Sequence, residues 1–94
     1  METDDVVRVL AALAQETRLE AFRLLVQAGP EGLPAGEIAE QLDVPAPTLS
    51  FHLKALAQGD LVHVQRDGRS LFYAPNFATL NEVLAFLTKN CCGG

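Results

Sequence analysis

The stretch DVPAPTLSFHLKALAQGDL, residues 43–61, is the most informative part of this chain about its fold. A turn that contains Pro45 opens it and Gly59 closes it, which predicts one helix over about residues 45–58. Leu49, Leu53 and Leu56 recur at i, i+4 and i+7 and give that helix an apolar stripe for a core. The opposite side is polar and accessible; it carries Pro47, Ser50, Phe51, Lys54 and Gln58, with Thr48 and His52 on its flanks.

A second short helix is expected immediately upstream, over residues 33–42 (LPAGEIAEQL). Ile38, Ala39 and Leu42 form its inward side. Only residues 43–45 separate the two helices. Two short helices joined by a tight turn are typical of the helix-turn-helix, whose second helix enters the DNA major groove.

A β-hairpin is expected directly after the recognition helix, over about residues 61–74. Residues 61–65 (LVHVQ) alternate apolar and polar, residues 66–70 (RDGRS) form a turn around Asp67-Gly68, and residues 71–74 (LFYA) form the second strand. Such a hairpin makes the unit a winged helix, with Arg66 and Arg69 at the wing tip, where they can reach phosphates or a minor groove. The predicted DNA-binding residues are Pro47, Thr48, Ser50, Phe51, His52, Lys54, Arg66 and Arg69.

The composition predicts one small domain over residues 1–94, mainly α-helical with a β-hairpin wing. The net charge of −5 argues against a general polyanion binder. However, residues 51–70 hold Lys54, Arg66 and Arg69 against only Asp60 and Asp67. Neither a Lys/Arg-flanked apolar N-terminus nor an apolar run of about 18 residues occurs, so we expect a cytoplasmic protein without a membrane partner.

Three further helices are expected, over residues 4–14, 16–28 and 76–90. The middle one places Leu19, Phe22, Leu25 and Val26 on one side. The first and last helices are apolar over a wider arc than one core contact requires. We therefore expect a homodimer that forms through the first and last helices.

Three segments together resemble the ArsR-type family of dimeric winged-helix repressors that sense metals and metalloids. They are LAQETRLEAFRLL (13–25), LPAGEIAEQLDVPAPTLSFHLKALAQGDLV (33–62) and RDGRSLFYAP (66–75). The resemblance implies a homodimer that binds inverted-repeat operator DNA and releases it when an inducer binds. The chain departs from the common family pattern at Phe51, where many relatives carry Arg or Gln, and at Gly59-Asp60, where Ala-Gly is usual. The first departure leaves the base preference open.

The C-terminal residues 91–94 (CCGG) form a thiol tail that is the candidate inducer site. Soft thiolates suit soft ions, and adjacent cysteines do not easily close a disulfide, so Cys91 and Cys92 are expected to stay reduced and available. The family resemblance adds that sensor cysteines in some members form a vicinal pair after the last helix. The family's His/carboxylate zinc site, which lies across the paired last helices, is not evident here, because the last helix has no His and its only acid is Glu82.

The expected ligand is trivalent arsenic, with antimony as a second candidate. Arsenic takes three sulfur ligands and the chain supplies two. The third sulfur has three candidate sources: the partner subunit, a small thiol such as glutathione, or residues beyond Gly94.

Several residues keep a second interpretation. Cys91 and Cys92 fit an inert tail as well as a metal site. His52 is either a structural, hydrogen-bonded imidazole or a phosphate donor, and Phe51 contacts either thymine methyl groups or the preceding helix. His63 points outward on its strand and is expected to be only solvated.

Other functional classes are less well supported. No Gly-rich phosphate loop occurs, and the available Cys and His residues belong to separate elements, so the chain is not expected to be an enzyme. A winged-helix protein-interaction module is the alternative that the negative charge favours. Within repressors, the alternative is a thiol redox or persulfide sensor, although that class usually places its two cysteines on separate helices.

Overall fold

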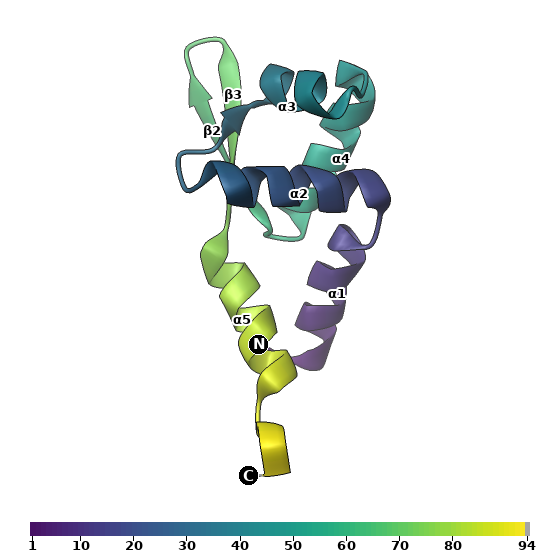
Figure 1. Ribbon diagram of the computed structural model, residues 1–94, viewed down its shortest axis with the longest axis vertical. Coiled ribbons are helices and arrows are strands. Elements are labelled where there is room, and N and C mark those ends of the chain that lie inside the picture. Colours follow the sequence, from purple (N-terminus) through teal and green to yellow (C-terminus); the bar gives the residue numbers. More distant parts are fainter. Residues whose placement is uncertain (94) are drawn as a thin grey trace.

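The computed structural model describes residues 1–93. Its elements are α1 (Thr3–Leu13), α2 (Glu16–Ala28), β1 (Leu33–Pro34), α3 (Ala35–Leu42), α4 (Ala46–Gln58), β2 (Val62–Asp67), β3 (Ser70–Pro75), α5 (Phe77–Thr88) and the 3-10 turn η1 (Cys91–Gly93). The predicted fold class, a mainly helical winged helix-turn-helix, is confirmed. Figure 1 shows α3 and α4 beside the β2–β3 hairpin, with α2 running across the body below them.

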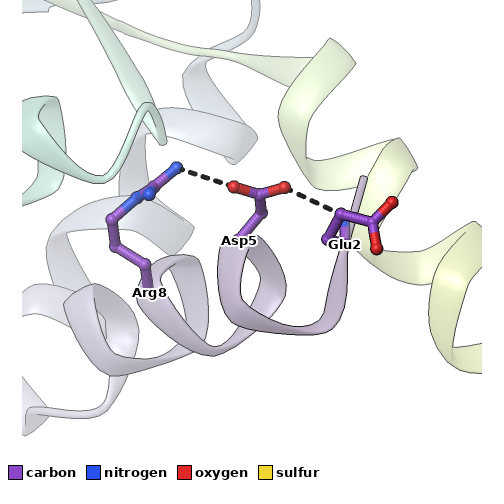
Figure 2. A network of polar contacts seen from close by, with 3 residues as sticks. All are labelled: Glu2, Asp5 and Arg8. Atoms are coloured by element: carbon purple, nitrogen blue, oxygen red, sulfur yellow. Dashed lines mark hydrogen bonds and ion pairs between the residues drawn. The ribbon is translucent and has the colours of Figure 1, made fainter.

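The helix ends are set by local side chains and backbone. The Gln15 side chain accepts a hydrogen bond from the Arg18 amide at 3.0 Å and starts α2. Asp43 adopts the left-handed conformation (φ 53°) and ends α3, which allows the tight turn into α4. At α1, Asp5 accepts hydrogen bonds from the Glu2 amide and from the Arg8 guanidinium (Figure 2).

The core lies where α2, α3 and α4 meet the base of the hairpin. The predicted stripe of α4, Leu49, Leu53 and Leu56, is at most 1% exposed. The other fully buried large side chains are Leu25, Ile38 and Leu61. Leu19, expected on the inward side of α2, is instead 45% exposed, at the edge of a hollow that Leu42 of α3 also lines.

The sheet differs from the prediction in two places. Leu33 and Pro34 are not helical but form β1, which pairs with Tyr73 and Phe72 and makes a three-stranded antiparallel sheet in the order β1-β3-β2. Leu33 stays out of the helix for a local reason, because a residue before proline is disfavoured in the α conformation. Its pairing with Tyr73 depends on β3 lying beside it. The hairpin strands are also longer than expected, since Asp67 pairs with Ser70.

The wing turn is therefore the two residues Gly68-Arg69 rather than a loop around Asp67-Gly68. Gly68 has φ +62°, which a tight hairpin turn requires at its first central position. The shorter turn leaves Arg66 within β2 and places only Arg69 at the tip.

Gly32, just before β1, makes a close approach that no other residue can make. Its φ is +75°, and a Cβ built there would lie 2.3 Å from the Tyr73 carbonyl oxygen. We expect Gly32→Ala to lower the free energy of unfolding by at least about 2 kcal/mol, because it adds left-handed strain to a clash with backbone. Urea denaturation measures this loss.

Gly36 supplies the control for that measurement. It lies in α3, and a Cβ there would meet nothing within 4 Å. Gly36→Ala should leave stability unchanged or raise it by up to about 1 kcal/mol. Equal effects of the two substitutions would contradict the role assigned to Gly32.

Helices α1 and α5 extend from the winged-helix body on the side opposite the wing tip (Figure 1). The molecule is elongated, with extents of 49 × 23 × 19 Å. Val6, Val9 and Val83 are buried, whereas Val7, Leu10, Leu84 and Leu87 remain 39–58% exposed. Among residues 1–93, no helix is both long and apolar enough to cross a membrane.

Candidate nucleic-acid interface

The outward side of α4 is the centre of the candidate site. Five of the predicted DNA-binding residues are exposed on it: Pro47, Thr48, Ser50, Phe51 and Lys54. The first turn of α4 contains no acidic residue. Its positive helix end and the Lys54 ammonium therefore favour an anionic partner.

Phe51 is the most exposed of the large apolar side chains, at 65%. The Phe51 and His52 rings pack in a T-shaped arrangement, with centroids 5.5 Å apart. With His52 and Arg18 beside it, the Phe51 ring is still exposed enough to contact a thymine methyl group. The DNA contact of Phe51 therefore stays a prediction, and its packing contacts are with His52 and with Arg18 of α2.

His52 is half-buried and hydrogen-bonded to α2. The Arg18 Nε donates to His52 Nδ1 at 3.1 Å, and the Arg18 guanidinium carbon lies 5.7 Å from the Phe51 ring centroid. Because Nδ1 accepts this bond, the ring proton must sit on Nε2, which is then the only ring donor for a DNA acceptor. The Arg18 contact thus fixes the orientation of His52 and covers one side of Phe51.

Arg18 is the site residue that sequence reasoning missed. It lies 34 positions before His52, so no local periodicity connects the two. The only signal was its place in the segment ETRLE (16–20), which contributed to the family resemblance without a role for the side chain.

The two wing arginines lie in different surroundings. Arg69 is exposed in the turn, whereas Arg66 shares a hollow of about 400 Å³ with Glu31 and Asp67. Those two carboxylates lower the positive potential around Arg66. Arg69 is therefore the better placed of the two for a phosphate or a minor groove.

The thiol tail differs from its prediction. Cys91 and Cys92, expected to stay open because they are adjacent, are joined by a disulfide in the structure. A left-handed backbone at Cys92 (φ 68°, ψ 26°) turns the chain within this short segment. Both residues are exposed, and His63 is exposed on β2 as expected.

The tail is remote from the α4 surface. It follows α5 at the end of the molecule opposite the wing (Figure 1). Within residues 1–93, no group of three or more His, Cys, Asp or Glu side chains gathers in a way that could hold a metal ion.

Comparisons with known proteins agree with this arrangement. The helix-turn-helix domain family matches residues 13–65. The HTH-type transcriptional regulator KmtR of Mycobacterium tuberculosis is 38% identical over 68 residues, which make up 72% of this chain and 50% of that protein. The arsenical resistance operon repressor of Staphylococcus aureus is 32% identical over 84 residues, 89% of this chain and 78% of that protein.

A solved structure shares the fold over nearly the whole chain. It is the homodimeric winged helix-turn-helix DNA-binding domain Mb0332 of Mycobacterium bovis, with a TM-score of 0.73 and 30% identity. The similarity covers 93% of this chain and 81% of that one. By contrast, the chain spans only half the length of KmtR.

Proposed function

Since the chain belongs to the ArsR-type family of winged helix-turn-helix transcriptional regulators, we propose that it is a repressor. In this proposal it binds inverted-repeat operator DNA as a homodimer and leaves the operator when trivalent arsenic binds Cys91 and Cys92. Its relatives are transcriptional regulators, which confirms the expectation that the chain is not an enzyme. The observation that carries the proposal is the uncovered side of α4, whose exposed residues face away from the core beside the wing.

DNA binding by α4 follows from how its two sides differ. The buried stripe anchors the helix in the core, so the helix is positioned rigidly while its polar side stays open. Ser50 and Thr48 can bond base edges or phosphates, Phe51 can contact thymine methyl groups, and Lys54 can neutralise a phosphate. Arg69 would add a contact from the wing.

Dimerisation is supported by the apolar surface that α1 and α5 leave open. Val7 and Leu10 on α1, and Leu84 and Leu87 on α5, are exposed although both helices also contribute buried residues. Pairing of these surfaces across a two-fold axis would cover them and place two α4 helices on one DNA face. Half-sites then lie about 34 Å apart.

Arsenic binding is proposed from the chemistry of the tail and from the similarity to an arsenical resistance operon repressor. The disulfide must first be reduced by a cellular thiol, which is oxidised in the exchange. The two thiols then condense with arsenous acid: two As–S bonds form, two As–OH bonds break, and two water molecules leave. A small thiol or the partner subunit would replace the third hydroxyl, and antimony would follow the same course.

Release would operate through the dimer. The tail follows α5 directly, so an ion held at Cys91 and Cys92 would alter how α5 packs against its partner. A small rotation there moves both α4 helices out of register with their half-sites. The coupling is reciprocal and commonly amounts to about 1–3 kcal/mol, so operator DNA must weaken arsenic binding by the same factor.

The proposal is tested by selecting duplexes from a random pool with the reduced protein and titrating the preferred duplex by fluorescence anisotropy. We expect an inverted repeat, affinity that falls steeply with salt, and release by arsenite but not by zinc. Operator binding that arsenite leaves undisturbed would remove the inducer assignment. Failure to select any duplex at low salt would remove the DNA-binding assignment and favour a protein-interaction module.

A further inference from the structure

A hollow of about 350 Å³ lies between α1, α2 and the C-terminal half of α4. Arg8, Arg18 and Gln58 line it with polar side chains, and no carboxylate lines it. We refer to it as the Arg8–Arg18 hollow. Its remaining lining residues are small: Ala11, Ala12, Ala55 and Gly59.

The small residues keep this hollow open while holding the helices together. A Cβ built on Gly59 would lie 2.6 Å from the Ala12 Cβ, so α1 approaches the end of α4 as closely as packing allows. No large side chain fills the space above that contact. Arg8 and Arg18 therefore border a shallow, open depression.

Both guanidinium groups can donate hydrogen bonds to an anionic ligand. Arg18 uses its Nε for His52, and among residues 1–93 no carboxylate lies within ion-pairing distance of it. Its two terminal nitrogens remain available as donors. Arg8 contacts Asp5 at 3.4 Å in an exposed pair whose side chains are 61% and 37% exposed, a kind of pair that contributes little.

The hollow flanks the side of α4 that is proposed to face DNA. Gln58 lies seven positions after Phe51 and thus on the same helix face, and the Arg18 guanidinium lies 5.7 Å from the Phe51 ring. A helix about 10–12 Å in diameter nearly fills a major groove about 12 Å wide, so its flanks run along the sugar-phosphate backbone. The Arg8–Arg18 hollow is where that backbone would pass.

We propose that the Arg8–Arg18 hollow binds one phosphate of the DNA backbone beside each half-site, an inference that rests on the proposed operator binding. Arg18 bonds the phosphate through its terminal nitrogens while its Nε holds His52, and Arg8 approaches from α1. Arginine is suited to this because its planar fork matches phosphate oxygens. The contact sets the position of α4 in the groove and carries no base information.

The first test compares Arg8→Gln and Arg8→Gln/Arg18→Gln with the wild-type protein on the selected duplex across a salt series. Loss of one phosphate contact should reduce the slope of log affinity against log salt by about 0.9 for each bound protomer. The preference for the selected duplex over one with a mutated half-site should be unchanged for Arg8→Gln. This single variant is the cleaner arm, because Arg8 touches neither His52 nor Phe51 in the structure.

Arg23→Gln is the matched control, since Arg23 is an exposed arginine of α2 that lines a different hollow with Glu20. Arg8→Gln and Arg23→Gln carry the same charge change, so a slope loss shared by Arg23→Gln would be a general charge effect and would overturn the proposal. Thermal melting should show all variants folded, because the substituted side chains are solvent-accessible and none of them belongs to the core.

The second test locates the phosphate with duplexes that carry a neutral methylphosphonate at one position at a time. At one position, the methylphosphonate should lower the DNA affinity of the wild-type protein and leave the affinity of Arg8→Gln/Arg18→Gln unchanged. Equal sensitivity of both proteins at every position would overturn the assignment of a phosphate to the Arg8–Arg18 hollow, while leaving operator binding intact. If the wild-type protein binds no duplex specifically, the proposed function fails and this site fails with it.

Discussion

The variant Cys91→Ser/Cys92→Ser is expected to stay on operator DNA at arsenite concentrations that release the wild-type protein completely. A serine hydroxyl is a hard, protonated group at neutral pH and a poor ligand for a thiophilic ion. Its operator affinity without arsenite should equal that of the wild-type protein, because both cysteines are exposed and lie at the opposite end of the molecule from the wing. Anisotropy of labelled operator DNA, with the protein in a thiol reductant, measures both properties.

The disulfide supplies an internal control for this experiment. Since Cys91 and Cys92 are joined in the structure, the wild-type protein without reductant should resist arsenite as the double variant does. Addition of reductant should restore release for the wild-type protein only. A double variant that still dissociates with arsenite would place the inducer site elsewhere in the protein.

The variant Leu84→Glu/Leu87→Glu is expected to be monomeric and to lose at least about 100-fold in operator affinity. The two leucines are 50% and 58% exposed on α5, and burying two carboxylates in a dimer interface is unfavourable. A monomer binds one half-site and loses the additional affinity that a dimer gains by binding two half-sites at once. Analytical ultracentrifugation measures the oligomeric state, and anisotropy measures the affinity.

Leu19→Glu is the control for the dimer experiment. Leu19 has a similar exposure, 45%, but lies on α2 and not on α1 or α5. The Leu19→Glu variant should remain dimeric and keep its operator affinity. A double α5 variant that sediments as the wild-type protein does would show that the dimer forms through another surface.

The candidate site was predictable where its residues belong to one helix. Pro47, Thr48, Ser50, Phe51 and Lys54 lie on the exposed side because Leu49, Leu53 and Leu56 on the other side are buried. Ten consecutive residues, 47–56, contain that information, since it is only a matter of helical period. The role of Arg18 was not predictable, because its contact with His52 spans 34 positions.

The helix-turn-helix, the wing and the apolar character of the first and last helices could be predicted from the sequence, since periodicity, turn residues and caps act within a few positions. Three features appear only in the folded chain: Leu33-Pro34 adds a third strand, Arg8 and Arg18 border one hollow, and Cys91 pairs with Cys92. The first two features depend on how closely segments distant in the chain approach one another. The third depends on a backbone turn at Cys92 that a residue type alone does not specify. Packing and backbone conformation, not composition, fix such contacts.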